Sequence, residues 1–229
     1  MKGKNMSTEL TLVHYKPLQE GLPPLYSSSL RRCFADRFPH ECFHNHTPDG
    51  RSRYRGAPVQ FKVINDEVFL MGINEGAAFL TAFQWPQTME VPIGKTDQIA
   101  VLQFIGKRMT PATFSEIEPQ AYRSLSPYLP LNQDAFKAFQ EKSDPERRAL
   151  VERKLCEHIL SAAKWCGVWV KHRIDVSLIQ MRLRPSIRVK SNLAFLGMDV
   201  LFETNTAIPD FMGIGRFVSR GYGTLARYG

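Results

Sequence analysis

The chain has 229 residues, of which 43% are hydrophobic and 23% are charged, so it can form a packed core and is excluded from the disordered and fibrous classes. It contains no run of about 18 apolar residues, which excludes a transmembrane helix, and no apolar segment follows its basic N-terminus, so we expect no signal peptide. Its formal net charge of +8 favours an anionic partner such as RNA, DNA or acidic lipid. The four cysteines form no C-x-x-C pair, and we therefore expect reduced thiols in a cytoplasmic protein with no membrane partner.

The first half of the chain predicts a strand, a helix, two strands, a helix and a strand, in that order. Asn65-Asp66 is a turn-prone pair between the two middle strands, and Asn74 is expected to cap the second helix. Residues 40–55 are polar and rich in Gly, Pro and His, and are expected to form a loop. The predicted elements are residues 10–15, 25–38, 59–64, 67–73, 74–85 and 99–104. This order is that of the ferredoxin-like split βαβ unit.

The second half predicts another α+β unit of similar size, which begins near Thr110-Pro111. Asp144 is expected to be the N-cap and Pro145 the first helical residue of a long helix that Gly167 ends. One face of this helix carries the apolar residues Leu150, Val151, Leu155, Ile159, Ala162 and Ala163. The expected strands are residues 122–125, 174–183 and 194–202. We therefore divide the chain into residues 1–110, which carry a His-rich loop, and residues 111–229, which carry a Gly-rich loop.

The His-rich loop contains the string Phe43-His44-Asn45-His46, followed by Arg51, Arg53, Tyr54 and Arg55. Histidine titrates near neutral pH, so it can take a proton from one oxygen and give a proton to another. RNA supplies its own nucleophile, the ribose 2′-hydroxyl. Cleavage then needs a base, an acid, and cations for the charge that develops on the phosphorus. Histidines beside arginines and a tyrosine fit the cleavage of a phosphodiester.

Two other interpretations of the same loop stay open. Cys42, His44 and His46 are metal-ligand types at alternating positions, although no second ligand cluster lies at zinc-like spacing. Alternatively, the histidines are solvated side chains of a structural loop.

A basic stretch covers residues 171–190 and contains a single acidic residue, Asp175. In a strand, Gln180, Arg182 and Arg184 would share one face, opposite Ile179, Met181 and Leu183. The pattern indicates either a track for RNA phosphates or an ordinary solvated sheet face. The basic residues are Lys171, Arg173, Arg182, Arg184, Arg188 and Lys190. Lys62, on the strand after the His-rich loop, is expected either to reach the same path or to lie on the surface.

The last candidate is the glycine-rich segment from Pro209 to Leu225. Glycines allow positive φ angles and close backbone approach, and interleaved arginines favour contact with a polyanion. The alternative interpretation is a glycine-rich hairpin with a purely structural role, which closes a sheet. The glycines are Gly213, Gly215, Gly221 and Gly223, which bracket Arg216, Ser219 and Arg220. Nearby are Phe211, Phe217 and Tyr222, which are candidates for base stacking, although core packing is the favoured interpretation of Phe211 and Phe217.

Taken together, these residues resemble the CRISPR-associated endoribonucleases that cut precursor CRISPR RNA within its repeats, the sixth Cas family of the RAMP superfamily. The C-terminal G-I-G-R-F-V-S-R-G-Y-G resembles that family's glycine-rich loop, G-x-G-x(5)-G-x-G with a basic residue inside. The stretch from F-H-N-H to Y-R-G-A-P-V-Q-F-K resembles the b-type branch seen with subtype I-B systems. The Gly56-Ala57 pair departs from the bulkier apolar residue expected before Pro58, which affects the alignment of Tyr54.

The resemblance implies an α+β protein with two tandem ferredoxin-like (RRM-like) domains and a C-terminal glycine-rich loop. It implies metal-independent cleavage with no cofactor, which leaves a 2′,3′-cyclic phosphate and a 5′-hydroxyl. His44 and His46 are then the acid/base pair and Tyr54 assists. The expected RNA-binding residues are Arg53, Arg55, Lys62, Arg182, Arg184, Arg188, Lys190, Gly213, Gly215, Arg216, Ser219, Arg220, Gly221 and Gly223.

The expected partner is CRISPR repeat RNA, and the resemblance leaves open other subunits of a CRISPR effector complex and a homodimer. One alternative function is a non-catalytic RNA-binding scaffold subunit of such a complex. Another is an interaction domain stabilised by zinc on Cys42, His44 and His46.

Overall fold

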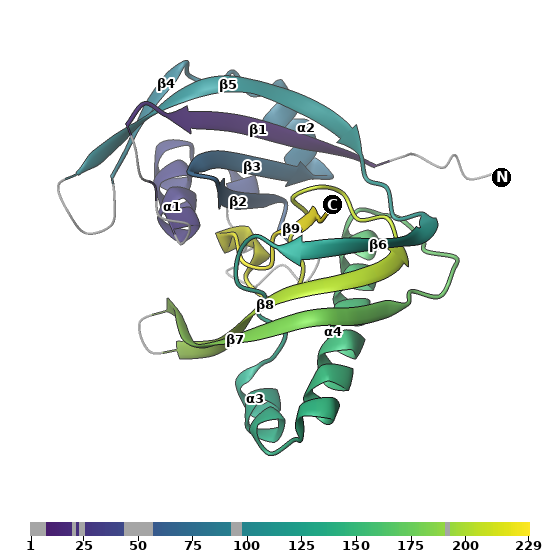
Figure 1. Ribbon diagram of the computed structural model, residues 1–229. Helices are drawn as coiled ribbons and strands as arrows, with labels where there is room; N and C mark the ends of the chain where they lie inside the picture. Colours follow the sequence, from purple (N-terminus) through teal and green to yellow (C-terminus); the bar gives the residue numbers. More distant parts are fainter. Residues whose placement is uncertain (1–7, 20–21, 23–25, 44–56, 93–97, 191–192) are drawn as a thin grey trace. The chain divides into compact units, whose positions relative to one another are not determined.

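A computed structural model describes residues 8–19, 22, 26–43, 57–92, 98–190 and 193–229. The chain divides into two compact units (Figure 1). The first contains the described residues up to Ala112, together with Trp165–Val168 and Ser219–Gly221. The second contains Thr113–Lys164, Trp169–Val218 and Tyr222–Gly229. Two short segments from the second half of the sequence therefore belong to the first unit.

The first unit is a five-stranded antiparallel sheet with two helices. Its strands lie in the order β2-β3-β1-β5-β4. Without the edge strand β4, this is the order of a ferredoxin-like unit, as the sequence predicts. The elements are β1 (Glu9–Pro17), α1 (Ser27–Arg37), the 3-10 turn η2 (Glu41–Phe43), β2 (Val59–Ile64), β3 (Glu67–Ile73), α2 (Glu75–Ala82), β4 (Thr88–Pro92) and β5 (Ile99–Pro111).

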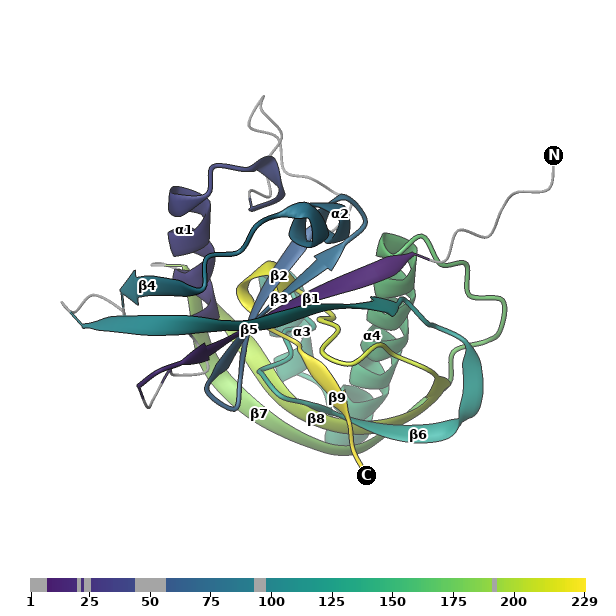
Figure 2. The same ribbon diagram turned by 90° about the horizontal axis from the view of Figure 1, so that it is seen from above.

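Both helices of the first unit cover the same face of its sheet (Figure 2). The alternating residues of β1 that face the helices, Val13 and Tyr15, are buried with Leu30 and Phe34 of α1 and Leu80 of α2. Aromatic rings fill this core because large rings bury the most apolar area per side chain. The core fixes α1 against β2, and both elements matter for the candidate site.

The predicted hairpin turn of the first unit is confirmed, and the predicted helix cap is confirmed in position only. Asn65 and Asp66 have φ angles of 49° and 64°, as a tight two-residue hairpin turn requires. Asn74 does precede α2, but its side chain makes no capping hydrogen bond. Its Nδ2 donates instead to the carbonyl oxygen of Trp165. Asn74 is therefore the N-cap residue, as predicted, but its side chain binds a tertiary partner and does not bond the first turn of the helix.

The second unit repeats the same sheet order with different elements. Its strands lie in the order β7-β8-β6-β9, which corresponds position for position to β2-β3-β1-β5. The elements are β6 (Glu116–Ser124), α3 (Gln133–Gln140), α4 (Asp144–Trp165), β7 (Val176–Lys190), β8 (Leu193–Thr206), the 3-10 turn η3 (Val218–Arg220) and β9 (Leu225–Arg227). Where the first unit has α2, the second has the glycine-rich segment between β8 and β9. The predicted pair of tandem ferredoxin-like units is confirmed.

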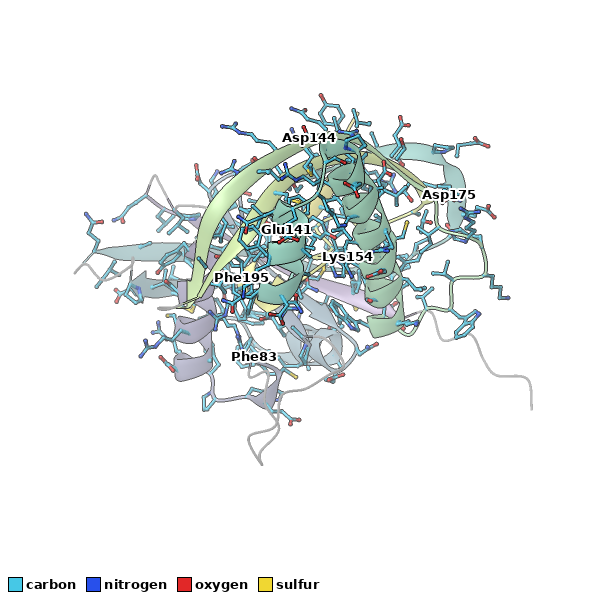
Figure 3. The ribbon with its side chains drawn as sticks, turned by 90° about the horizontal axis from the view of Figure 1, so that it is seen from below. Phe83, Glu141, Asp144, Lys154, Asp175 and Phe195 are labelled. Atoms are coloured by element: carbon cyan, nitrogen blue, oxygen red, sulfur yellow. The ribbon has the colours of Figure 1, made fainter. Side chains whose placement is uncertain are left out.

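Helices α3 and α4 lie side by side against one face of the second sheet (Figure 3). Ser143, and not Asp144, precedes the first residue of α4: its backbone N–H and its hydroxyl both donate to Glu146 Oε2, at 2.8 and 2.6 Å. The bond from the Ser143 N–H to the Glu146 side chain is one half of a capping box, so the predicted cap was one residue late. Of the predicted apolar face, Val151, Leu155, Ile159, Ala162 and Ala163 are buried, whereas Leu150 is half-buried.

Strand β7 is the edge strand of the second sheet and is exposed on both faces in its middle. Gln180, Arg182 and Arg184 are exposed, as predicted for one face. On the other face Ile179 and Leu183 are also exposed, by 48% and 40%. The pairing with β8 shifts register between Leu178 and Gln180, so the strand bulges at Ile179. After the bulge, Met181 and Leu183 pair with the buried residues Val200 and Met198, so they keep the inward side that alternation predicts, and the edge position leaves Leu183 exposed.

Candidate functional site

The glycine-rich segment closes the free edge of β2 in the first unit. β2 is an edge strand, and unpaired backbone groups at an edge need cover. Gly221 has φ +84°, and a Cβ on it would lie 2.5 Å from Ser27 Oγ and 2.8 Å from the Phe61 carbonyl oxygen. Only glycine fits there, because any side chain would strike both α1 and β2. The residues Ser219–Gly221 thus lie against the start of α1 and the middle of β2.

Arg31 ties this region to the start of the His-rich loop. Its Nε donates to the carbonyl oxygen of Phe43 at 3.3 Å, and Phe43 directly precedes His44. Burial, and secondarily the positive charge of Arg220, lower the pKa of Arg31. Two guanidinium groups therefore lie near each other beside the backbone that enters the predicted catalytic loop. Closely placed guanidiniums form a binding site for an oxyanion, because an anion relieves their repulsion and accepts their hydrogen bonds.

Sequence reasoning missed Arg31, although its spacing from Ser27 in the predicted helix was visible in the sequence. Ser27 and Arg31 are four residues apart in α1, so they lie on the same helix face. Ser27 meets Gly221, and Arg31 meets Phe43, so this face looks toward the glycine-rich segment and the start of the His-rich loop.

The residues His44, His46, Arg53, Tyr54 and Arg55 lie outside the described residues, so their predicted roles stay predictions. Both described ends of this segment are anchored in the first unit. Phe43 is buried and packs on Phe34, Phe61 and Phe79. At the other end, the Pro58 carbonyl accepts a hydrogen bond from the backbone N–H of Ile73 at 2.8 Å.

Lys62 is buried, and the expectation that it lies on the surface is wrong. Its exposed fraction is 1%, and its Nζ donates to Gln60 Oε1 at 2.9 Å. Burial lowers the pKa of Lys62 to about 7. Val59, Phe61 and Val63 of the same strand face α1 and α2, so Lys62 points to the opposite face of the sheet. Its contact with an RNA phosphate stays a prediction.

The second unit supports the glycine-rich segment with its own polar pair, which sequence reasoning also missed. Tyr128 Oη lies 2.6 Å from His158 Nδ1. Burial raises the pKa of Tyr128 and lowers that of His158 to about 4, so His158 is neutral at pH 7. A Cβ on Gly215 would lie 2.8 Å from the Tyr128 ring. The segment therefore turns directly over the Tyr128–His158 pair.

Other residues of the segment divide between core and surface. Ser219 is 5% exposed and Tyr222 is also buried, in a cluster with Leu129, Val189 and Phe195. The base-stacking interpretation of Tyr222 thus gives way to core packing. Gly213 pairs with Thr224 in an isolated bridge, and Ile214 N–H donates to the Gly223 carbonyl at 3.0 Å. Phe217 is half-buried against Phe195, Phe211 is half-buried, and Arg216 is exposed above the Phe217 ring.

The residues of the predicted phosphate track lie on β7, and their contact with RNA stays a prediction. Arg182 and Arg184 are exposed, and Arg184 Nε forms an ion pair with Asp199 Oδ2 at 2.7 Å. Asp199 lies on β8, and sequence reasoning missed this ion pair between two strands. Arg188 and Lys190 belong to β7, but their side chains lie outside the described part of the chain.

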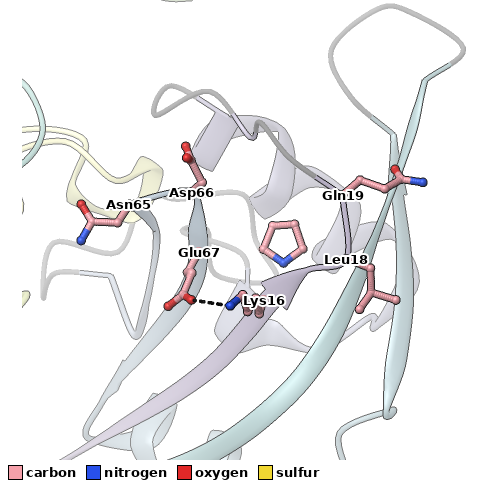
Figure 4. Close-up of a pocket in the computed structure, with 7 residues that line it drawn as sticks. Lys16, Leu18, Gln19, Asn65, Asp66 and Glu67 are labelled. Carbon is pink, nitrogen blue, oxygen red and sulfur yellow. Dashed lines mark ion pairs between the residues drawn. The ribbon is translucent and has the colours of Figure 1, made fainter.

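A separate cleft in the first unit has mixed charge (Figure 4). Glu67 accepts from His14 Nε2 at 2.8 Å and lies 3.9 Å from Lys16 Nζ. Asp66 adds a second carboxylate beside it. These carboxylates make the cleft unsuited to a phosphate backbone, in contrast to the Arg31 region.

Among the described residues, no group of three or more His, Cys, Asp or Glu side chains is arranged to hold a metal ion. Of the three proposed zinc ligands, Cys42 is buried in η2, and its backbone N–H donates to His40 Nδ1 at 3.2 Å. The other two, His44 and His46, lie outside the described residues. Within the described ranges, no helix has the length and apolar character needed to cross a membrane.

Solved structures of CRISPR-associated proteins share this fold. One, described as a crystal structure of Cas6b, aligns with a TM-score of 0.78 at 24% identity over 96% of this chain and 100% of that chain. Another, a CRISPR RNA processing endoribonuclease Cas6b, aligns with a TM-score of 0.67 at 22% identity, with the same two coverages. A RAMP protein that binds different RNA substrates aligns with a TM-score of 0.55 at 13% identity, also over 96% and 100%. The two tandem units therefore have the fold of Cas6 and RAMP proteins.

Sequence comparison then gives the family. Residues 8–107 match the Cas6b N-terminal domain, and residues 115–228 match the Cas6b C-terminal domain. "Uncharacterized protein MJ0978" of Methanocaldococcus jannaschii is 30% identical over 106 residues, which are 46% of this chain and 71% of that protein. The chain belongs to the Cas6b family. The predicted resemblance to the b-type branch is confirmed.

Proposed function

We propose that this protein is a metal-independent endoribonuclease that cleaves precursor CRISPR RNA within its repeats. The observation that carries the proposal is the hydrogen bond from Arg31 to the Phe43 carbonyl, with Arg220 beside Arg31. It brings the glycine-rich segment and the entry to the His-rich loop to one place on the first unit. Membership of the Cas6b family supports the same activity, as does the structural similarity to a Cas6b that processes CRISPR RNA.

The proposed reaction uses the substrate's own hydroxyl group. One histidine of the pair His44 and His46 removes the proton from the ribose 2′-hydroxyl, and the 2′-oxygen attacks the adjacent phosphorus. The bond from phosphorus to the 5′-oxygen breaks, and the other histidine protonates that oxygen. The products are a 2′,3′-cyclic phosphate and a 5′-hydroxyl, and no water or metal ion enters the balance.

The cations have distinct proposed roles. Arg31 and Arg220 neutralise the charge that develops on the phosphoryl oxygens, which is where preorganised donors act most strongly. Tyr54 assists the histidines, and Arg53 and Arg55 hold the phosphate that is cleaved. Farther along the RNA, the exposed cations of β7 contact phosphates without reading the base sequence.

The test is incubation of the purified protein with labelled repeat RNA in EDTA, beside the same RNA with a 2′-deoxy nucleotide at the cut site. We expect cleavage that persists in EDTA and is lost with the deoxy substitution. Replacing both His44→Ala and His46→Ala is expected to abolish cleavage and to leave RNA binding nearly unchanged. Cleavage by the double variant would contradict the mechanism, whereas binding without cleavage by the wild type would favour the scaffold function.

A further inference from the structure

The segment between α4 and β7 presents a tryptophan and two cations to solvent. Trp169 is 80% exposed, more than any other large hydrophobic side chain in the described ranges. Exposure alternates along residues 169–175, so that Trp169, Lys171 and Arg173 are exposed while the residues between them are half-buried. The chain bends at His172, between Lys171 and Arg173. Trp169, Lys171 and Arg173, here called the Trp169 strip, are the successive exposed side chains of this short segment.

The inward side of this segment is firmly attached to the second unit. His172 Nε2 lies 2.8 Å from Thr206 Oγ1. Asn205 holds the backbone at two points: its Nδ2 donates to the Arg173 carbonyl at 2.9 Å, and its Oδ1 accepts from Asp175 N–H at 2.9 Å. Asp175 lies at the outer end of the segment, just before β7 (Figure 3). The backbone of Arg173 and Asp175 is thus held by the second unit, which lowers the entropic cost of ordering this segment on a partner.

The combination of an exposed tryptophan with two neighbouring cations points to one kind of partner. Aromatic residues are enriched at binding surfaces, and an aromatic ring beside cations is the composition of surfaces that bind single-stranded nucleic acid. Lys171 and Arg173 favour an anionic partner. Arg173 Nε does pair with Asp175 Oδ1 at 3.1 Å, but both side chains are exposed, at 90% and 63%. An exposed ion pair of this kind is weak enough to exchange for a phosphate.

We propose that the Trp169 strip binds single-stranded RNA independently of sequence. The indole of Trp169 stacks on one unpaired base, and Lys171 and Arg173 contact the phosphates that follow it. Every base has a flat face, so stacking tolerates any sequence, and cations that meet phosphates add no preference. The inference rests on the proposed RNA-processing function and adds a second contact surface, outside the residues assigned to cleavage.

The test measures binding of a labelled single-stranded oligouridine to the full-length protein that carries His44→Ala and His46→Ala, so that cleavage does not interfere. In this background, Trp169→Ala is expected to weaken binding about tenfold, and Trp169→Phe is expected to retain most of the affinity. Replacing Lys171 and Arg173 by Ala should reduce the slope of log Kd against log salt concentration by the amount expected for the loss of about two phosphate contacts. Tyr228→Ala is the matched control, because Tyr228 is 52% exposed but has Arg123 over its ring, and it should leave the affinity unchanged.

Intrinsic fluorescence supplies a second readout. Trp85 is buried and Trp165 is half-buried, so stacking on Trp169 should produce most of the RNA-dependent quenching. We expect this quenching to disappear in Trp169→Phe. Unchanged affinity in Trp169→Ala together with unchanged quenching in Trp169→Phe would overturn the proposal. A change of molecular mass by light scattering in Trp169→Ala, without a change of affinity, would also overturn it and assign the strip to contact between copies of the chain.

Failure of this proposal is distinguishable from failure of the proposed function. Repeat cleavage by the His44→Ala, His46→Ala protein would contradict the cleavage mechanism but would leave the oligouridine measurement unaffected. Conversely, Trp169→Ala in the wild-type background should cleave saturating repeat RNA at the wild-type rate whether or not the strip binds RNA.

Discussion

Strands β2 and β7 occupy the same edge position in two sheets of the same strand order, yet their surroundings are opposite. All six residues of β2 are buried, including Lys62. The middle of β7 is exposed on both faces and carries Arg182 and Arg184. The two strands differ in burial because other segments cover only one of them. Ser219–Gly221 and α1 lie against β2, whereas the middle of β7 faces solvent.

The comparison teaches how one fold provides two different surfaces for the RNA contacts that we propose. A closed edge excludes water and holds a few groups in fixed geometry, which is what an acid/base reaction on a phosphate needs. An open, cationic edge gives many weak contacts with phosphates, which position an RNA but carry no chemistry. The predictions below break or sharpen this contrast, beginning with the largest expected effect.

Arg31→Ala should lower the single-turnover rate of repeat cleavage by about 10²–10³-fold, because it removes a fixed cation from the closed edge. Arg31→Lys should recover only part of this rate, since an ammonium lacks the guanidinium's fork of donors. The control is Arg32→Ala, because Arg32 is 87% exposed and pairs only weakly with Asp36 at 3.7 Å. Equal rates for the two alanine variants, with RNA binding intact, would remove Arg31 from the site.

Lys62→Met should change the pH dependence of stability. The pKa of Lys62 is about 7 in the folded state, well below its value of about 10.4 in an unfolded chain, so the unfolded state binds more protons between these values. The folded state therefore gains stability as pH rises through this window, by about 3 kcal/mol over two pH units for this group alone. Chemical denaturation at pH 7.5 and 9.5 measures it: the stability advantage of Lys62→Met over the wild type should shrink by that amount. A constant difference would show that Lys62 is not buried in solution.

Gly221→Ala should destabilise the protein by about 2 kcal/mol, because a residue with a Cβ is strained at positive φ and would also strike Ser27 and the Phe61 carbonyl. The measurement is the free energy of unfolding in urea. Gly106→Ala is the matched control, since nothing lies within 4 Å of a Cβ built there. If Gly106→Ala costs as much as Gly221→Ala, close packing of the glycine-rich segment on β2 is not the cause.

Arg182→Ala and Arg184→Ala should have the smallest effects, about 1 kcal/mol or less in RNA affinity each, and should leave the cleavage rate at saturation unchanged. Each should reduce the slope of log Kd against log salt by about one phosphate contact. Arg184→Ala should have the smaller effect, because Asp199 already partly neutralises Arg184. A large loss of cleavage rate in either variant would contradict the division between a closed reactive edge and an open binding edge.

The sequence by itself determined the order of most elements, because local periodicity and turn chemistry carry that information, but it missed β4, α3 and β9. The alternation in β1 and β3, the turn at Asn65-Asp66 and the apolar face of α4 all depend on residues only a few positions apart. The same local reasoning identified the glycine-rich segment from its spacing. Cap contacts were less predictable: Asn74 is the N-cap residue of α2 but its side chain binds Trp165, and Ser143 takes the position expected for Asp144.

Only the tertiary structure decided which of these segments meet. Arg31, Phe43 and Arg220 come together through the packing of α1 on β2 and the passage of Ser219–Gly221 along that edge, and no local pattern encodes contacts between residues so far apart in sequence. The burial of Lys62 was equally hidden, because alternation places its side chain on a face without telling what covers that face. Sequence patterns fix the direction of a side chain along its own element, whereas burial and charge environment depend on the partner that packing brings to it.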